Sequence, residues 1–234
     1  MFDFQGKTVV VTGGTSGIGR QTALAFLQAG ASVIAVGLPT TESLPPEVRK
    51  EILDIHDTAA LHSLFDGIPE LHALVNAAGI IRRDDEFKLD IFAGVLDVNL
   101  TGTMRVCMAA HPRLLAGKGS VINFASMYSF FGAPRAPAYS ASKGAIALLT
   151  KSLAVAWGPE GIRVNAVAPG WIATTLTQAL RDDPARSAPI LSRTPFGRWG
   201  RPEEIVGPIL FLASEAASFV TGAILPVDGG YSAG

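Results

Sequence analysis

A tyrosine and a lysine, Tyr139 and Lys143, stand four residues apart in the segment PRAPAYSASKGAIALL, with only small residues between them. Residues at this spacing share one face of a helix. An ammonium group about 4 Å from a phenol, at an effective dielectric constant of about 20, contributes roughly 4 kcal/mol to the phenolate, enough to lower a phenol pKa from about 10 to about 7. The pair therefore predicts a tyrosine that exchanges protons near neutral pH. A surface tyrosine and lysine on an amphipathic helix would show the same spacing.

Two other polar residues precede this helix at positions where a ligand would lie. Ser126 ends the β-branched run GSVINFAS, and its hydroxyl is placed to hydrogen-bond a substrate carbonyl oxygen as charge develops there. Asn99 lies inside a helical stretch, although asparagine is a mediocre helix former. It is interpreted as an anchor for a water that relays protons to Lys143. The alternative interpretations are an ordinary cap for Ser126 and a local kink for Asn99.

A glycine-rich turn, VTGGTSGIGR, separates the first strand-like run from the first helical segment. Gly13, Gly17 and Gly19 follow the spacing G-x-x-x-G-x-G. Glycine permits positive φ and close backbone approach, and a helix N-terminus supplies free N–H groups, so this junction favours the pyrophosphate of a dinucleotide. A tight strand–helix turn that needs glycine only for its geometry is the alternative.

The end of the second predicted strand carries information about the cofactor. Dinucleotide folds place an acidic residue there for the adenosine ribose, or an arginine nearby for a 2′-phosphate. Here Gly37 and Leu38 stand at these positions, so both groups are missing. Without a cation for the phosphate, the sequence favours NAD, and NADP is not excluded. Glu42 or the threonines before it are candidates to replace the missing acid.

The elements that must position these residues alternate between strands and helices along the whole chain. The predicted strands are residues 7–12, 31–37, 51–55, 71–79, 119–126, 162–170 and 222–230. Continuously apolar strands that alternate with helices predict an α/β, doubly wound Rossmann-type fold, with a parallel sheet and helices on both faces. No repeat or linker interrupts the pattern, so we expect residues 1–234 to form a single dinucleotide-binding and catalytic domain. The irregular segment 171–204 is predicted to cover the ligand crevice at the carboxyl ends of the strands.

Composition excludes several classes of protein. The net charge of −1 argues against nucleic-acid and membrane-surface partners, which select a basic excess. The single cysteine, Cys107, excludes an internal disulfide framework. The four histidines are scattered without metal-ligand spacing, so no metal is expected. We find no signal peptide and no apolar run of the roughly 18–20 residues that span a bilayer, and we expect a cytoplasmic protein.

Several motifs together identify a family. TGGTSGIG, NAAG, Asn99, Ser126, YSASK, VNAVAPG and VDGG resemble, in order and spacing, the short-chain dehydrogenase/reductase family over about residues 5–232. The resemblance implies a seven-stranded parallel Rossmann-type sheet and hydride transfer between an alcohol or carbonyl and a nicotinamide cofactor. It implies that Tyr139 is the general acid/base, that Lys143 binds the nicotinamide ribose and lowers the tyrosine pKa, that Ser126 positions the carbonyl and that Asn99 holds the relay water.

The same resemblance assigns the coenzyme contacts. They are Gly13, Thr15, Ser16, Gly17, Ile18, Gly19, Gly37, Asp54, Ile55, Asn76, Ala77, Gly79, Tyr139, Lys143, Pro169, Gly170, Ile172 and Thr174. Two departures from the family pattern stand out besides the Gly37–Leu38 pair. Ala77 replaces an asparagine that many members repeat, and the stretch between Val36 and Glu51 is short, so the second helix is predicted to be truncated or absent.

Within the family, the segments that would line the substrate crevice are similar to sugar-acid dehydrogenases of the 2-deoxy-gluconate and 2-keto-3-deoxy-gluconate type. These segments include GIIRRDD and ASMYSFFGAPRAPAYSASK. Guanidinium groups bind carboxylates in a bidentate manner, so arginines are candidate clamps for an acidic substrate. The candidate substrate contacts are Arg82, Ser126, Met127, Arg135 and Tyr139, with Arg135 as the first choice. Arg83, Arg193 and Arg198 are alternatives, and nothing in the sequence orients Arg181 or Arg186.

Two other functions remain open on the same fold. A 3-oxoacyl-carrier-protein reductase shares the four catalytic residues, but it would favour a basic patch and an arginine near position 38. A non-catalytic dinucleotide-binding regulatory protein would be expected to lack Tyr139, Lys143 or Ser126. The expected partner is a small-molecule substrate, with no nucleic acid and no membrane. The broad apolar faces of residues 86–115 and 138–157, together with the family resemblance, predict a homotetramer.

Overall fold

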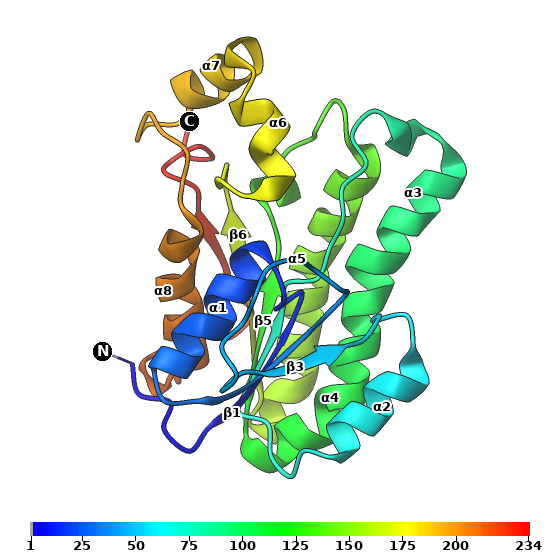
Figure 1. Cartoon of the computed structure of the whole chain (residues 1–234), viewed down its shortest axis with the longest axis vertical. Helices are drawn as coiled ribbons and strands as arrows, with labels where there is room; N and C mark the ends of the chain where they lie inside the picture. Colours follow the sequence, from blue (N-terminus) through cyan, green and yellow to red (C-terminus); the bar gives the residue numbers. More distant parts are fainter. Residues whose placement is uncertain (1) are drawn as a thin grey trace.

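Seven parallel strands form a single sheet in the computed structural model, which describes residues 2–234 (Figure 1). The strands are β1 (Thr8–Thr12), β2 (Ser32–Gly37), β3 (Arg49–Ile52), β4 (Ala73–Asn76), β5 (Ser120–Phe124), β6 (Arg163–Pro169) and β7 (Ile224–Val227). Their order is β3-β2-β1-β4-β5-β6-β7, and every neighbouring pair is parallel. The predicted doubly wound sheet is confirmed. The strand order reverses between β1 and β4, which is where such sheets bind their ligands.

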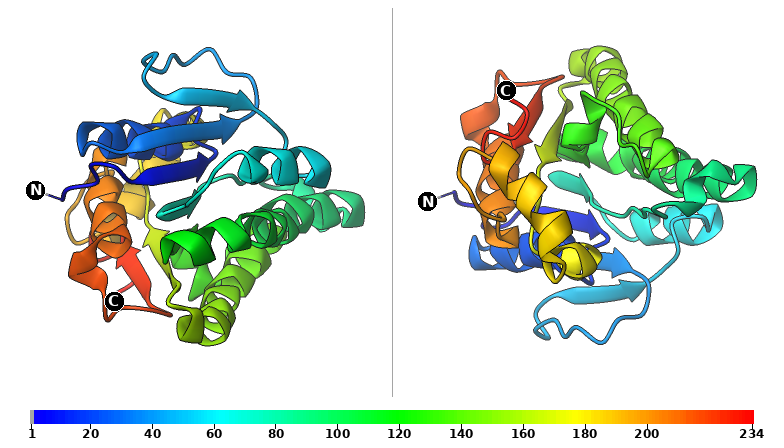
Figure 2. Two further views of the ribbon diagram at one scale, coloured as in Figure 1. Left: turned by 90° about the horizontal axis from the view of Figure 1, so that it is seen from below. Right: turned by 90° about the horizontal axis from the view of Figure 1, so that it is seen from above.

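Helices cover both faces of the sheet, as the two further views show (Figure 2). Helices α1 (Gly17–Gln28) and α8 (Pro202–Ala213) pack on one face. Helices α2 (Thr58–Asp66), α4 (Thr103–Gly117) and α5 (Pro137–Trp157) pack on the other. The remaining helices are α3 (Leu89–Leu96), α6 (Gln178–Arg181) and α7 (Pro184–Arg193). This arrangement explains why β1, β2, β4, β5 and β6 are largely apolar, because both of their faces are buried. The edge strand β3, with the sequence RKEI, is mostly exposed.

The two faces of β1 show how the sequence builds the core. Val9 and Val11 are buried in the same cluster as Phe26 of α1. Val10 points the other way and is buried in the same cluster as Leu114 of α4. Successive side chains of a strand alternate between faces, so a run of three valines supplies both layers. The rigid end of β1 thereby holds the glycine turn that follows it.

Two regions depart from a regular α/β alternation. Residues 38–48 contain no helix, which confirms the predicted loss of the second helix. After β6, the predicted covering segment contains α6 and α7, which lie together beyond one end of the sheet (Figure 1). It also contains a short 3₁₀ turn, η5 (Thr175–Thr177), whose residues line the cavity described below. The covering segment therefore carries more regular structure than its irregular sequence pattern predicted.

The helical stretch Leu89–Gly117 is long and apolar enough to cross a membrane by length and composition, although the sequence pattern predicted no such segment. Its contacts account for it as part of the fold. Val106 and Leu114 are fully buried in the core against the sheet, and Arg105 forms an ion pair with Asp97 at 2.7 Å. Helix α3 packs on α5 and α4 packs on α2.

Candidate active site

The glycine turn after β1 needs glycine for close contacts as well as for its backbone angles. A Cβ on Gly13 would lie 2.7 Å from the backbone of Ala77, and one on Gly19 would lie 2.1 Å from the carbonyl oxygen of Gly13. Gly17 has φ +53° with open space around its Cα. The N-cap of α1, Ser16, makes no side-chain cap hydrogen bond. The glycine turn and the start of α1 therefore bring closely packed backbone and helix N–H groups together, an arrangement that suits a pyrophosphate.

We expect Gly19→Ala to lower the free energy of unfolding by about 1–3 kcal/mol, because the new methyl group must displace the Gly13 carbonyl. Coenzyme affinity should fall with it. Gly94→Ala is the matched control: a methyl group on this exposed glycine of α3 would have nothing within 4 Å, so alanine should raise stability by about 0.5–1 kcal/mol. Urea unfolding and coenzyme fluorescence titration measure both effects. Equal stability of the two variants would contradict the close-contact explanation.

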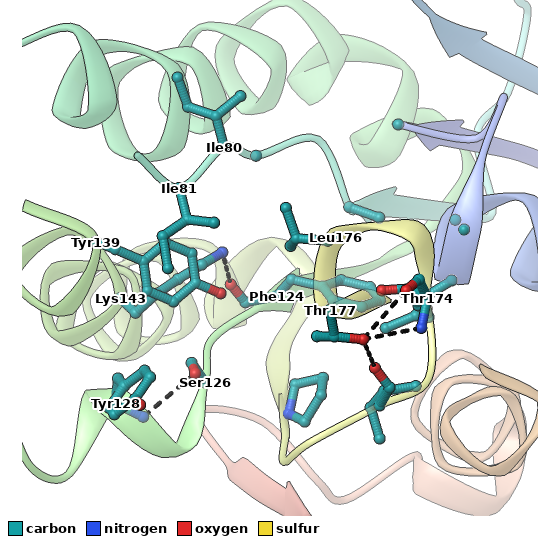
Figure 3. Close-up of a pocket in the computed structure, with 18 of the residues that line it drawn as sticks. Ile80, Ile81, Phe124, Ser126, Tyr128, Tyr139, Lys143, Thr174, Leu176 and Thr177 are labelled. Atoms are coloured by element: carbon teal, nitrogen blue, oxygen red, sulfur yellow. Dashed lines mark hydrogen bonds between the residues drawn. The ribbon is translucent and has the colours of Figure 1, made fainter. Parts of the chain in front are cut away.

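A cavity of about 520 Å³ extends from the glycine turn to the Tyr139–Lys143 pair (Figure 3). It lies at the carboxyl ends of β1, β4, β5 and β6, on both sides of the switch point. The sequence-predicted residues that line it are Gly13, Ser16, Gly17, Ile18, Gly19, Ala77, Gly79, Ser126, Met127, Tyr139, Lys143, Pro169, Gly170, Ile172 and Thr174. Residues from most of the chain thus converge on one elongated cavity.

Tyr139 and Lys143 lie one turn apart near the start of α5, and both face the cavity. The Lys143 Nζ atom is 5.5 Å from the centroid of the Tyr139 ring and donates a hydrogen bond of 2.6 Å to the carbonyl oxygen of Phe124 (Figure 3). Burial lowers the pKa of Lys143 to about 8. The ammonium form therefore persists at neutral pH next to the phenol.

The pKa of Tyr139 differs from the sequence prediction. Burial of the phenol raises it, whereas the nearby Ser126 hydroxyl and the charge of Arg83 act in the opposite direction. The buried carboxylate of Glu86 raises it further. The prediction of a lowered pKa considered a cation beside the ring but left out desolvation, which here is the largest effect.

Ser126 begins a short 3₁₀ turn, η3 (Met127–Ser129), at the end of β5. Its hydroxyl accepts a hydrogen bond from the Tyr128 N–H at 3.2 Å, and the Ser129 hydroxyl donates one of 2.7 Å to the carbonyl oxygen of Lys143. Ser126 therefore caps this turn and also lines the cavity, so the two interpretations of this residue are compatible. The turn ties the end of β5 to α5, which fixes Ser126 beside Tyr139.

Asn99 lies in a π-helical turn, Asp97–Gly102 (η2), which joins α3 to α4. Its side-chain oxygen accepts a hydrogen bond from the Ile80 N–H at 2.8 Å. Its amide donates to the Ile80 carbonyl at 2.9 Å and to the Ser142 hydroxyl at 3.0 Å. The side chain is thus engaged with the protein and holds the segment after β4 against α5. π-turns of this kind are frequent at functional sites, and the water-anchoring role stays a prediction.

Several predicted coenzyme contacts lie outside the cavity. The Thr15 hydroxyl donates to the Leu38 carbonyl at 3.2 Å, and a Cβ on Gly37 would lie 2.5 Å from that hydroxyl oxygen. These two residues therefore brace the glycine turn from the side of β2. The buried Asn76 donates to the Asn123 side-chain oxygen at 2.9 Å, so its side chain turns into the core instead of toward the cavity.

Asp54 and Ile55 follow β3, near the far edge of the sheet. The Asp54 carboxylate accepts a hydrogen bond from the His56 backbone N–H at 3.0 Å and lies 2.6 Å from the His56 ring, and both contacts lower its pKa. The Ile55 side chain is buried against Gly102, where a Cβ would lie 2.6 Å from its terminal carbon. Neither side chain lines the cavity, although both stand at the carboxyl edge of the sheet, where the adenine was expected.

The arginines predicted to bind the substrate lie outside the cavity, and a neighbouring one lies in it. Arg82 is exposed and lies outside the cavity. Arg135 also lies outside, because it is exposed and forms a bidentate ion pair with Asp84. Arg83 lines the cavity instead. The doublet RR in the sequence signalled this position, but it could not show which of two neighbouring side chains turns inward.

The other candidate arginines have partners elsewhere. The Arg193 guanidinium lies 4.7 Å from the centroid of the Phe131 ring and 4.4 Å from that of Tyr231. Arg198 pairs with Glu204 at 2.6 Å. Within residues 2–234, Arg83 has no carboxylate oxygen within 4 Å. Burial and the neighbouring charges of Arg186 and Arg135 lower its pKa. A half-buried cation repelled by two others is a site that favours an anion.

Fold and site together define an enzyme of the dinucleotide-binding α/β class, with a tyrosine–lysine pair beside the coenzyme cradle. The family model described as enoyl-(acyl carrier protein) reductase matches residues 13–232. The chain belongs to this family, the short-chain dehydrogenases/reductases.

Three relatives are informative about the branch of the family. The 2-dehydro-3-deoxy-D-gluconate 5-dehydrogenase of Escherichia coli (strain K12) is 40% identical, over 99% of this chain and 98% of the relative. The enzyme of the same name from Bacillus subtilis (strain 168) is 42% identical, over 98% of this chain and 96% of the relative. A gluconate 5-dehydrogenase from Burkholderia cenocepacia J2315, solved in complex with NADP and tartrate, is 33% identical with a TM-score of 0.92, over 100% of this chain and 98% of that chain.

Proposed function

We propose that this protein is a nicotinamide-dependent dehydrogenase that interconverts a secondary alcohol and a ketone of a sugar acid, of the 2-deoxy-gluconate or 2-keto-3-deoxy-gluconate type. The observation that carries the proposal is the presence of Tyr139, Lys143 and the half-buried Arg83 in one cavity. The names of the similar enzymes from Escherichia coli and Bacillus subtilis support it. The same side chains serve oxidation and reduction, and the supply of substrate sets the direction.

The chain offers a nicotinamide coenzyme a continuous path. The pyrophosphate would lie against Gly13, Gly17 and Gly19 at the start of α1, and the nicotinamide end would reach Lys143. When bound, the coenzyme supplies the hydride acceptor or donor. The remaining steps belong to side chains of the protein.

Tyr139 would accept the proton of the substrate hydroxyl during oxidation and return it during reduction. The Ser126 hydroxyl, at the end of β5, would hold the substrate oxygen on the other side. The Lys143 ammonium favours the phenolate by its charge and would bind the ribose with the donors that the Phe124 carbonyl leaves free. Leu176, from the segment after β6, faces the same space (Figure 3) and helps to exclude water.

Arg83 would bind the carboxylate of the substrate. It lies in the cavity near the Tyr139 phenol, whose pKa its charge lowers. Arg186, on the covering helix α7, has a buried Nε atom without a hydrogen-bond partner among residues 2–234, and its charge acts on Arg83. A carboxylate between these groups would relieve the repulsion and draw the covering segment toward the substrate.

Two side chains near the coenzyme cradle bear on the choice between NAD and NADP. The Glu42 carboxylate accepts a hydrogen bond from the Gly17 N–H at 3.4 Å and lies 3.8 Å from the Arg20 guanidinium. An acid here suits the ribose hydroxyls of NAD, whereas Arg20 would suit the 2′-phosphate of NADP. We propose NAD as the coenzyme, with NADP as the second candidate. The Burkholderia cenocepacia relative was solved with NADP.

A spectrophotometric panel tests the proposed function. NAD and NADP are each offered with 2-deoxy-gluconate-type sugar acids, neutral polyols and an acetoacetyl thioester, and reduced coenzyme is followed by absorbance. We expect turnover with sugar acids. Turnover with the thioester and NADPH alone would favour a 3-oxoacyl-carrier-protein reductase. Coenzyme binding without any turnover would favour a regulatory dinucleotide-binding protein.

We also propose a homotetramer, located in the cytoplasm. Leu148 and Val155 on α5 are 66% and 79% exposed in the single chain, and Met108 and Leu115 on α4 are also exposed. Exposed apolar side chains on two long helices suit a helix–helix interface between subunits. The single cysteine, Cys107, is a buried free thiol, in keeping with a reducing compartment.

Light scattering should give a mass of about four times the 24.4 kDa of one chain. Val155→Glu should reduce that mass to that of dimers or monomers, because burying an unpaired carboxylate costs several kcal/mol. Phe219→Ser, at a fully exposed phenylalanine outside α4 and α5, is the comparison variant. A monomeric wild-type protein would contradict the proposed assembly.

A further inference from the structure

Glu86 is a completely buried acidic residue outside the four expected catalytic positions. It lies in the short turn η1 (Asp85–Phe87), which follows β4, and its relative exposure is 0%. Within residues 2–234 no lysine, arginine or histidine nitrogen lies within 4 Å of its carboxylate. Burial of a carboxylate without a cation is costly unless hydrogen bonds satisfy it. The hydrogen-bond partners of Glu86 therefore explain how its buried carboxylate is stabilised.

The carboxylate accepts two backbone hydrogen bonds from two different elements. One oxygen accepts the N–H of Arg82 at 2.8 Å, and the other accepts the N–H of Tyr139 at 2.8 Å. Tyr139 is the third residue of α5, in the first turn, where N–H groups have no partner within the helix. The N-cap of α5, Ala136, has no side chain that could supply one. Glu86 therefore caps α5 from another segment, and the positive end of the helix favours its charge.

These two hydrogen bonds connect the segment of Arg83, the proposed carboxylate-binding residue, to Tyr139, the proposed proton acceptor. Arg82 directly precedes Arg83, which lines the cavity. Tyr139 is held by its own backbone N–H. A second link runs parallel to the first, because the Asp84 N–H donates to the Arg135 carbonyl at 2.8 Å. The segment that carries Arg83 is thereby fastened to the start of α5 at two points.

We propose that Glu86 is a positioning residue that sets the distance between the carboxylate-binding Arg83 and the Tyr139 phenol, and that its charge tunes proton transfer by Tyr139. The proposal rests on the proposed sugar-acid dehydrogenase function. One buried carboxylate then controls both the geometry and the electrostatics of the site.

The electrostatic part has a definite direction. The groups around Tyr139 are Lys143 from α5, Ser126 at the end of β5, Tyr128 from η3, and Arg83 and Glu86 from the segment after β4. Of the charged groups among them, only Glu86 is negative, and its charge raises the pKa of Tyr139. Loss of that charge should therefore lower the pKa of Tyr139. Oxidation, which needs the phenolate, should then begin at lower pH.

Three variants separate the effect of the Glu86 charge from the effect of the Glu86 side-chain length. Glu86→Gln removes the charge and keeps the size, but its single amide oxygen can accept only one of the two backbone hydrogen bonds. We expect the acidic limb of the pH profile of kcat for sugar-acid oxidation to move down by about half to one pH unit, with some loss of kcat. Glu86→Asp keeps the charge but shortens the side chain; the limb should stay, while kcat falls about ten-fold because the reacting groups are misplaced. Asp85→Asn removes an equal charge from the same turn, where Asp85 is exposed and pairs with Lys88 at 2.7 Å, and it should leave both quantities unchanged.

A limb that stays in place in Glu86→Gln, or a wild-type kcat in Glu86→Asp, would overturn the proposal. An equal shift in Asp85→Asn would also overturn it, since it would reduce the effect to general surface charge. Ultraviolet titration of phenolate formation, in a chain with three tyrosines, follows the ionisation of Tyr139 without substrate when it is compared with Tyr139→Phe. If the wild-type enzyme oxidises no sugar acid, the proposed function fails, and this titration still decides the role of Glu86.

Discussion

Tyr139→Phe is expected to lower kcat about a thousand-fold while the coenzyme dissociation constant changes little. The substitution removes only the phenolic hydroxyl, which is the proton acceptor of the proposed reaction, and general acid–base groups contribute about 10²–10⁴-fold to rate. The ring itself still packs beside Lys143 and Tyr128, so the cavity keeps its shape. Steady-state kinetics and coenzyme fluorescence titration measure the two quantities.

Tyr128→Phe is the matched control, because Tyr128 lines the same cavity and its ring meets that of Tyr139 edge to face at 6.4 Å between centroids. Burial raises the pKa of Tyr128 to about 12. In the proposed reaction the proton acceptor is Tyr139, whose ring lies 5.5 Å from the Lys143 ammonium, and Tyr128 only packs against it. Its loss should lower kcat less than about ten-fold. If Tyr128→Phe were as inactive as Tyr139→Phe, the assignment of the proton acceptor would be wrong.

The raised pKa of Tyr139 also predicts the pH dependence of the wild-type enzyme. Oxidation needs the phenolate, whose population rises as pH approaches the raised pKa. Oxidation should therefore be faster at alkaline pH than at pH 7. Reduction needs the phenol, which stays protonated well below the raised pKa, so its rate should fall only as the pH approaches that pKa. A rate of oxidation that falls between about pH 7 and 9 would contradict this assignment.

Arg83→Ala is expected to lower kcat/KM for a sugar acid about 100-fold and to change kcat/KM for a neutral polyol less than about three-fold. A charge-assisted bidentate pair in a partly buried site contributes about 2–4 kcal/mol on truncation. The neutral substrate has no carboxylate to lose. Arg83→Lys should give an intermediate loss, because a lysine keeps the charge but not the planar fork.

Arg82→Ala tests the proposed preference for Arg83 over Arg82 as the carboxylate-binding residue. Arg82 and Arg83 are adjacent and identical in type, yet Arg82 is exposed outside the cavity and Arg83 lines it. Arg82→Ala should therefore leave kcat/KM for the acid within about three-fold of the wild-type value, since a surface charge contributes little. Equal losses for acid and polyol in Arg83→Ala would remove the carboxylate site from the proposal.

The fold and most residues that line the candidate active site could be predicted from the sequence because the signals are local. The strand runs, the helical spacing of Tyr139 and Lys143, and the glycine turn each depend on neighbours within a few residues. The structure contains the predicted parallel sheet, and it has no helix between β2 and β3, as predicted. The cavity then brings together residues that were predicted separately.

What the sequence could not determine depends on long-range packing. The pKa of Tyr139 is set mainly by burial, which arises only when β5, α5 and the segment after β4 meet. The direction of Arg83 relative to Arg82 depends on a turn whose backbone is held by Glu86, and Glu86 is 53 residues from its partner Tyr139. A pattern of nearby residues reports propensity and spacing. Desolvation, side-chain direction and contacts between distant segments are properties of the folded chain, and these decided how the cavity is charged and which of the two arginines lines it.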